Sequence, residues 1–417
     1  MNILKSKLAA ALGIYTLSNV LNAAIPFLLL PILTDYLSPA DYGILSNFNG
    51  IITVVVPFVG INFMAAVSLQ YIKPEIDKAK YISTGLWILA FLTVLFSIIL
   101  SVFTGYMEEK TGVPAKYIHL VGIYALFSNL MEVILAIWRM ENKAVKYGIF
   151  RIGRTAVELG IALLLIVLYS WPFEGSIYAM YISYGLAAVI TIIVLWRKQL
   201  IVFDFSKAYS RHIFRYGIPL IPHALSGAIM MYSDKLIITE YLGLSAAGIY
   251  SVGFLVGQII GLFQNSFNQA WVPWAFQQLQ DNKPEMKLKM VKMTYLYFIG
   301  IIVFTLALWL ITPLVFYFIG KDFKAGMDLV LWVALGFAFN GMYKMVSVYL
   351  FYAEKTMQIA WLSIGAAILN ILLNLWWIPY WGVIGASLAT MLTLFIQFIC
   401  TWILSASLIQ MPWNLKK

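Results

Sequence analysis

Long apolar runs separated by short polar segments set the pattern of this 417-residue chain. A transmembrane helix needs about 20 predominantly apolar residues. Runs of that length predict twelve spans, at residues 8–33, 42–69, 82–106, 117–139, 148–170, 177–196, 216–239, 247–270, 293–319, 328–351, 356–378 and 384–410. The first run exceeds the apolar core of a cleavable signal, so we expect it to be retained as a span. The intervening segments are too short for a sizeable soluble domain.

Composition agrees with a membrane protein and narrows its chemistry. Hydrophobic residues make up 62% of the chain and charged residues 11%, whereas soluble chains carry about a quarter charged residues. The single cysteine, Cys400, excludes a disulfide within the chain and a multi-cysteine metal site. The histidines, His119, His212 and His223, are too scattered for a zinc motif, so no metal site is expected.

Basic residues predict the orientation. If the N-terminus is cytoplasmic, Lys110, Lys116, Lys321 and Lys324 are the basic residues of the outer segments, and most of the 28 lysines and arginines fall inside. This asymmetry is the positive-inside pattern and predicts that both termini are cytoplasmic. The net charge of +10 therefore reflects topology, and we do not expect a nucleic-acid partner.

A sequence repeat divides the chain. Residues 34–46 read TDYLSPADYGILS and residues 239–251 read TEYLGLSAAGIYS; GSIYA at 175–179 is echoed by GVIGA at 382–386. The offset is almost half the chain and superposes six spans on six, so both halves enter the membrane from the same side. The predicted fold is an all-α integral membrane protein with two parallel six-helix repeats around a central cavity. The predicted lobes are residues 1–200 and 201–417.

Two segments resemble one transporter family. Residues 215–251, RYGIPLIPHALSGAIMMYSDKLIITEYLGLSAAGIYS, are similar to the opening of the second half in Wzx-type polysaccharide flippases. Residues 370–390, NILLNLWWIPYWGVIGASLAT, resemble the penultimate hairpin of the same family. The superfamily also contains multidrug exporters of the MATE type and the lipid II flippase, which is usually longer by two spans.

The resemblance implies a transport function. Such proteins move an undecaprenyl-diphosphate-linked oligosaccharide from the cytoplasmic to the outer leaflet of the bacterial plasma membrane by alternating access. The sugar then feeds O-antigen, capsule or exopolysaccharide assembly. The implied partners are the lipid-linked oligosaccharide, membrane lipids and the polysaccharide polymerase machinery. Neither a cofactor nor an enzymatic activity is implied.

Ionisable residues inside the predicted spans are candidate substrate contacts, because such groups are costly in a bilayer and normally face a cavity or each other. In the seventh span, His223 and Asp234 fall about 20° apart on a helix, which predicts a shared cavity face. The alternative is that Asp234 pairs with Lys235 or with a neighbouring helix.

The hairpin of the fourth and fifth spans carries a second cluster. Arg151, Arg154 and Glu158 share one helix face, and Glu132 is expected opposite them across the hairpin. They could form a structural network. Alternatively, Arg151 and Arg154 receive the anionic diphosphate, since the guanidinium donates twice to phosphate oxygens, and Glu132 or Glu158 takes part in ion coupling.

Further polar positions suit a sugar, which offers hydroxyl groups and apolar ring faces. Lys344 could reach the cytoplasmic end of its span or face the cavity. Amide side chains recur at helical spacing in three spans and are either cavity-lining or engaged in interhelical hydrogen bonds. The candidates are Asn19, Asn22, Gln258, Asn265, Asn370 and Asn374.

Other functions fit the sequence less well. A MATE-like ion-coupled exporter of small molecules would favour a cavity dominated by acidic groups, whereas basic residues are at least as numerous here. A membrane glycosyltransferase or polymerase would need a large polar loop with catalytic carboxylates or histidine. A scaffold without transport would not need polar stripes within its spans. The chain contains no phosphate-binding loop for ATP hydrolysis.

Overall fold

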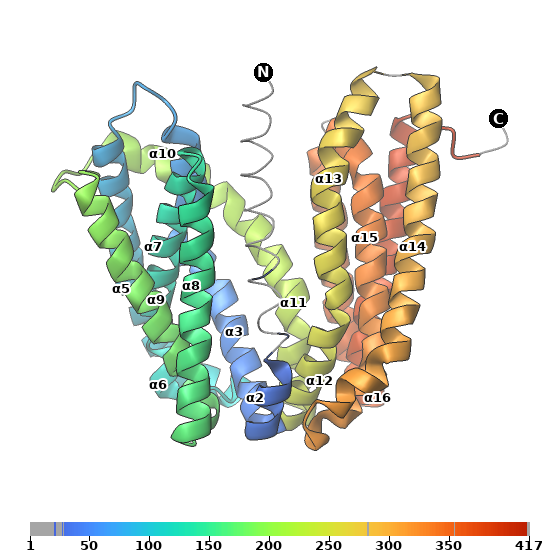
Figure 1. Cartoon of the computed structure of the whole chain (residues 1–417), viewed down its shortest axis with the longest axis horizontal. Helices are drawn as coiled ribbons and strands as arrows, with labels where there is room; N and C mark the ends of the chain where they lie inside the picture. Colours follow the sequence, from blue (N-terminus) through green and yellow to red (C-terminus); the bar gives the residue numbers. More distant parts are fainter. Residues whose placement is uncertain (1–20, 22–26, 28, 282, 354, 415–417) are drawn as a thin grey trace. The chain divides into compact units, whose positions relative to one another are not determined.

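The computed structural model describes residues 29–281, 283–353 and 355–414 together with Leu21 and Phe27, and all regular elements among them are helical (Figure 1). The side chains of His223, Ala224, Ser226 and Thr356 lie outside this description. Residues 36–232 form one compact unit, and residues 30–35 together with 233–417 form the second. Each unit is described separately.

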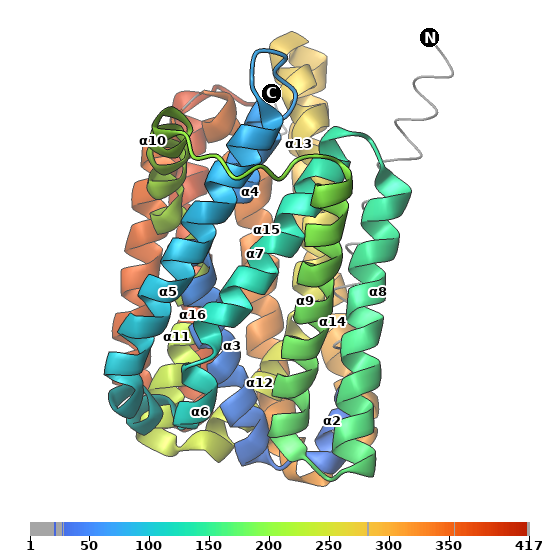
Figure 2. The ribbon, with the colours of Figure 1, turned by 90° about the vertical axis from the view of Figure 1, so that its left-hand side faces the viewer.

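In the described part of the chain, the first unit consists mainly of eight helices, and the first of them carries most of the first copy of the repeat. The helices are α3 (Pro39–Gly60), α4 (Phe63–Gln70), α5 (Lys78–Thr111), α6 (Ala115–Ile118), α7 (Val121–Met140), α8 (Ala144–Leu163), α9 (Pro172–Arg197) and α10 (Lys207–Gly217). A π-helical turn, Leu164–Leu168, extends α8. Helix α7 lies between α5 and α9, and α9 packs on α8 (Figure 2).

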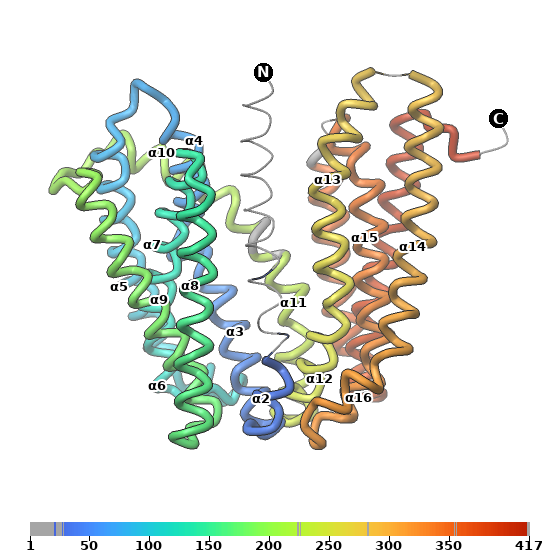
Figure 3. Tube along the Cα trace, viewed as in Figure 1, coloured from blue at the N-terminus to red at the C-terminus, as the bar shows by residue number. Residues whose placement is uncertain are grey.

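The second unit is built around α15. Its helices are α2 (Leu30–Tyr36), α12 (Leu244–Gly257), α13 (Ile259–Asp281), α14 (Pro284–Tyr317), a 3-10 segment (Lys321–Leu329), α15 (Val330–Tyr352) and α16 (Thr356–Leu408). Helix α15 contacts α13, α14 and α16 (Figure 3). Its buried face includes Val346, Tyr349 and Leu350, so this helix forms much of the core of the unit.

The boundary between the units falls inside α11 (Ile221–Leu242), between Tyr232 and Ser233. The Tyr232 ring lies against Gly50 of α3, where an added Cβ would come within 3.3 Å of it. The N-terminal half of α11 therefore packs with the first unit. The lobes expected from the repeat and the span count divide after residue 200, whereas the compact units divide after residue 232.

Eight helices in the described part of the chain are long and apolar enough to cross a membrane. One of them, α16, is two helices joined at Gly382, which has a φ of 62°. We call residues 356–381 the first arm and residues 383–408 the second arm of α16. Helices α8 and α11, with 20 and 22 residues, have the length of spans but carry ionisable residues. Each predicted span after the first thus has a helical counterpart, and most of the first span, residues 8–33, lies outside the described residues. The all-α multi-pass membrane fold is confirmed.

Local chemistry explains where the repeated helices begin. Ser38 caps α3 through a reciprocal capping box with Asp41, whose amide nitrogen lies 3.2 Å from the serine hydroxyl. In the second copy, Gly243 separates α11 from α12 with a φ of 86°, a conformation that glycine adopts without steric cost. Both copies of the repeat therefore form a tight helix–helix connection.

One end of the first unit is braced by Glu141, just after α7. Its carboxylate accepts hydrogen bonds from Lys143 at 2.7 Å, Lys198 at 2.6 Å and the Tyr71 hydroxyl at 2.6 Å. Burial alone raises the pKa of Glu141, but these hydrogen bonds outweigh it and lower the pKa to about 2. The brace connects the ends of α4, α7 and α9 outside the membrane-spanning segments.

Candidate functional site

A chain of hydrogen bonds joins α11, α12 and both arms of α16 in the second unit. Asp234 of α11 is fully buried and accepts a hydrogen bond at Oδ2 from the Tyr250 hydroxyl of α12. The Thr390 hydroxyl lies 3.4 Å from the same oxygen. Asn370 Nδ2 donates to Thr390 Oγ1 at 3.2 Å, and Asn374 Nδ2 donates to Asn370 Oδ1 at 3.1 Å. We call these five residues the Asp234 cluster.

The break in α16 assembles this cluster. Asn370 and Asn374 are four residues apart and therefore lie on the same face of the first arm. The positive φ of Gly382 lets the chain turn, and the second arm brings Thr390 back opposite Asn370. A residue with a Cβ would strain this turn. The sequence GVIGA thus supplies the turn that carries Thr390 to the carboxylate of Asp234.

Two oxygens of the Asp234 cluster have no hydrogen-bond partner among the described residues: Asp234 Oδ1 and Asn374 Oδ1. Lys235, the adjacent residue, is also buried, and its ammonium group lies 5.1 Å from the centre of the Phe254 ring. A buried carboxylate is normally paired, protonated or bound to a cation. The Lys235 ammonium and the Asp234 carboxylate attract each other, so a proton or a monovalent cation at the carboxylate would compete with this lysine.

A second cluster surrounds Arg154 in the first unit, with its side chain only 9% exposed. Its Nη1 donates to Glu158, one turn along α8, and its Nη2 donates to Thr155 Oγ1 at 2.7 Å. Its guanidinium stacks on the Tyr184 ring of α9, 4.3 Å from the ring centre. Ser183 of α9 approaches Glu158 at 3.5 Å. The Arg154 Nε atom is buried and has no hydrogen-bond partner among the described residues, so one donor of this cation remains open.

The other candidates on this hairpin are arranged differently from the expected network. Arg151 donates to the Tyr147 hydroxyl at 2.6 Å, and the Arg139 guanidinium lies 5.5 Å from the centre of the same ring. Glu132, on α7, is half-buried and forms no ion pair with a described residue. Arg154 and Glu158 therefore pair on α8 and against α9, rather than across the hairpin with Glu132.

Polar contacts between α13 and α15 form a third cluster, in the second unit. Lys344 Nζ donates to Asn265 Oδ1 at 2.5 Å. One turn away, the buried Gln264 donates through Nε2 to Asn340 Oδ1 at 3.0 Å. Gln258, at the junction of α12 and α13, is half-buried. Lys344 is thus fixed by an amide oxygen and has no carboxylate partner among the described residues.

Comparison with known proteins decides the family. A family model described as "Polysaccharide biosynthesis protein" matches residues 8–280. The chain belongs to this family.

Two curated relatives support the assignment. A capsular polysaccharide biosynthesis protein, CapF, from Staphylococcus aureus is 23% identical over 329 residues, which cover 77% of this chain and 80% of CapF. An uncharacterized membrane protein from Haemophilus influenzae is 24% identical over 389 residues, covering 90% of this chain and 93% of the relative. The likeness to the Haemophilus protein extends over nearly the full length of both chains.

Solved transporter structures share the fold. An inward-facing multidrug resistance transporter of the MATE family, in the MOP superfamily, superposes with a TM-score of 0.74 at 14% identity and covers 94% of each chain. The lipid II flippase MurJ in an inward closed conformation gives a TM-score of 0.73 at 16% identity, covering 96% of this chain and 87% of MurJ. This polysaccharide biosynthesis family member therefore shares the fold of these two solved structures.

Three predicted site residues cannot be placed on this fold. Asn19, Asn22 and the side chain of His223 lie outside the described residues. The structure also adds residues that the sequence did not single out, namely Tyr250, Thr390, Tyr184 and Gln264. Each of these residues contacts a polar residue that lies on another helix or on the other arm of α16. Helical periodicity within one span cannot predict a contact between two helices.

Proposed function

We propose that this polysaccharide biosynthesis protein moves an undecaprenyl-diphosphate-linked oligosaccharide from the cytoplasmic to the outer leaflet of a bacterial plasma membrane by alternating access. Family membership over residues 8–280 carries this proposal. The name of the related CapF protein, capsular polysaccharide biosynthesis protein, agrees with a role in supplying a surface polysaccharide. Both termini are cytoplasmic in this proposal, and a polysaccharide polymerase receives the product outside. The protein itself catalyses no covalent reaction.

Polar side chains between α13 and α15 support a polar cargo. The second unit places amides and a cation there, among them the buried Gln264, the half-buried Lys344 and the exposed Asn265. Amide and hydroxyl groups exchange hydrogen bonds with sugar hydroxyls at little cost. Arg154, with one N–H group open, is suited to a phosphate oxygen. We therefore retain Arg151, Arg154 and Lys344 as proposed contacts of the diphosphate.

We further propose that ion coupling involves the Asp234 cluster. Its single carboxylate is buried and has one free oxygen among the described residues. A proton or a monovalent cation bound there would cancel the charge that makes ionised Asp234 costly inside the unit. Glu158 and Glu132 remain proposed coupling residues of the first unit, with Glu158 the better placed because it already holds Arg154.

A reconstituted transport assay tests the function. Purified protein in liposomes should transfer a fluorescent undecaprenyl-diphosphate oligosaccharide between leaflets, measured by quenching of the outer-leaflet label. Arg154→Ala and Lys344→Ala should slow transfer by at least about tenfold, because a hydrogen bond to a charged group contributes about 1.5–3 kcal/mol. Arg197→Ala, at an exposed surface arginine, serves as the control and should leave the rate unchanged.

The same liposomes distinguish the alternative transporter function. Export of a cationic dye without movement of the fluorescent lipid would overturn the flippase proposal in favour of an ion-coupled exporter of small molecules. Transfer of the lipid by all variants at the wild-type rate would leave the flippase proposal standing and remove Arg154 and Lys344 from the substrate site.

A further inference from the structure

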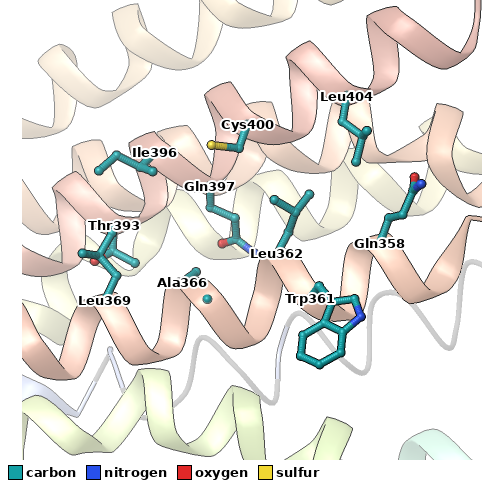
Figure 4. A pocket seen from close by; sticks show the side chains of 11 residues that line it. Gln358, Trp361, Leu362, Ala366, Leu369, Thr393, Ile396, Gln397, Cys400 and Leu404 are labelled. Atoms are coloured by element: carbon teal, nitrogen blue, oxygen red, sulfur yellow. The ribbon is translucent and has the colours of Figure 1, made fainter.

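A groove of about 470 Å³ lies between the two arms of α16. In Figure 4, Leu362 and Leu369 of the first arm and Ile396 and Leu404 of the second arm line it on opposite sides. Gln358 at one end and Leu369 at the other are eleven positions apart, which corresponds to about 16 Å along the helix. The volume is typical of a ligand site, and the mostly apolar lining suits a narrow hydrocarbon.

Polar side chains occur at intervals along this apolar groove. Thr393 is fully buried, and its hydroxyl has no hydrogen-bond partner among the described residues. Gln358 Oε1 is likewise buried without a described partner. Gln397, 6% exposed, reaches the Ser363 hydroxyl only at 3.5 Å. Other buried threonines of this unit, such as Thr401, donate to the carbonyl one turn back, so Thr393 differs from them in having an unsatisfied hydroxyl beside the groove.

The two ends of the groove differ in character. Gln358 and the exposed Trp361 line the groove near the start of α16. Lys355, three residues before Gln358, is exposed but does not itself line the groove. The other end is lined by Leu369 and Thr393. Asn370 of the Asp234 cluster follows Leu369 in the sequence, but no residue of that cluster lines the groove. The groove thus has a polar end near Lys355 and an apolar end near Leu369.

We propose that this groove binds the polyisoprenyl chain of the lipid carrier, with the carrier's diphosphate at the end formed by Lys355, Gln358 and Trp361. The inference rests on the proposed function, because it assigns the lipid part of that substrate to a site. Charge complementarity with Lys355 favours an anionic lipid at this end.

Two observations favour a polyisoprenyl chain over an acyl chain. Gly365 and Ala366 widen the middle of the groove, which leaves room for the methyl branches of an isoprenoid. An isoprenoid also has a double bond in every unit, and a π bond accepts a weak hydrogen bond. The free hydroxyl of Thr393 and the amide of Gln397 can donate to such bonds, whereas a saturated acyl chain has no acceptor.

Cross-linking tests the site without requiring transport. The full chain in phosphatidylcholine nanodiscs would be irradiated with a polyisoprenyl diphosphate that carries a photoreactive group on its chain, and the modified peptides would be mapped by mass spectrometry. Cross-links should fall within residues 358–369 and 393–404. A tenfold excess of unlabelled polyisoprenyl diphosphate should remove them, whereas the same excess of phosphatidylglycerol should not, and the fully hydrogenated carrier should remove them less completely than the unsaturated one.

A glycine pair provides matched variants. An added Cβ at Gly365 or at Gly300 of α14 meets no described atom within 4 Å, and replacing glycine inside a helix raises helix propensity. Gly365→Leu should lower cross-linking about tenfold, because it displaces about two methylene groups of the chain from the groove. Gly300→Leu should leave it unchanged. Thr393→Val, which keeps the side-chain shape, should reduce the preference for the unsaturated carrier about threefold.

The outcomes separate this proposal from the proposed function. Cross-links elsewhere, equal competition by phosphatidylglycerol, or equal loss in both glycine variants would overturn the groove assignment even if the protein transfers the lipid-linked sugar. If unlabelled polyisoprenyl diphosphate and the Gly365→Leu substitution both abolish the cross-links, the groove assignment would be supported even if no transfer occurs in the liposome assay.

Discussion

Asp234 illustrates how much a single side chain decides inside an apolar bundle. Moving an ionised carboxylate away from water is costly unless hydrogen bonds or an opposite charge compensate. Tyr250 and Thr390 approach one of its oxygens, and the other has no partner among the described residues. Hydrogen bonds thus hold the carboxylate in place, but one of its oxygens lacks a hydrogen-bond partner among the described residues. This is the state expected of a group that binds and releases a small cation.

Replacing this carboxylate should remove a cation-dependent gain in stability. We expect the unfolding temperature of the wild-type protein in detergent to rise with a monovalent cation or with added protons at constant ionic strength. A ligand at about one hundred times its Kd adds about 2.7 kcal/mol. Asp234→Asn, similar in shape, should abolish the rise, whereas Asp328→Asn, at an exposed position, should retain it. An identical response of all three proteins would contradict the proposed coupling site.

At the scale of elements, close helix contacts and end braces hold each unit together. Helix α12 approaches the 3-10 segment Lys321–Leu329 so closely that a Cβ on Gly253 would collide with the Gly326 carbonyl oxygen. At the end of α7, Glu141 connects three helices through Lys143, Lys198 and Tyr71. The α12 contact depends on the small size of glycine, so a larger residue should weaken it. The Glu141 contacts depend on charge, so a change of pH or removal of the carboxylate should weaken them.

Gly253→Ala should destabilise the second unit by about 1–3 kcal/mol, because the added methyl group meets backbone that cannot rotate away. The measurement is thermal unfolding in detergent. Gly300→Ala, where an added Cβ meets no described atom within 4 Å, should be neutral or slightly stabilising. Equal stability of the two variants would show that α12 and the 3-10 segment are less tightly packed than described.

Glu141→Gln should lower stability by about 1–2 kcal/mol at neutral pH, a value reduced for partial exposure of the partner lysines. Because the folded-state pKa, about 2, lies below the ordinary value of 4.5, the wild-type advantage is fully present above about pH 4.5. It should shrink as the pH falls toward 2, where the carboxylate becomes protonated in both states. Unfolding temperatures of both proteins between pH 3 and pH 7 would check this; a constant difference would refute the ion-pair explanation.

At the scale of the whole molecule, orientation follows from the distribution of basic residues along the chain. The chain has a single cysteine, Cys400, so a Cys400→Ala background allows clean labelling. In intact cells, Lys324→Cys should react with a membrane-impermeant maleimide and Lys287→Cys should react only after lysis. The reverse pattern would place both termini outside and invert the proposed direction of transport.

Sequence alone determined the membrane class, the approximate ends of the helices and the repeat. These properties depend on the local count of apolar residues and on short segments such as 34–46 and 239–251. The resemblance of residues 215–251 and 370–390 to polysaccharide flippases also led to the correct family. Each of these signals can be recognised in short continuous segments without knowing how the chain folds.

Only the tertiary structure decided which polar residues meet. Periodicity predicted that Arg154 and Glu158 share one face of a helix. In the structure, Arg154 stacks on Tyr184 of α9 and pairs with Glu158, and Glu132 of α7 forms no ion pair with a described residue. Periodicity also gave no reason for Asp234 to meet Thr390, 156 residues away. Helix periodicity specifies a face, whereas the partner of that face depends on packing and crossing geometry summed over the whole unit.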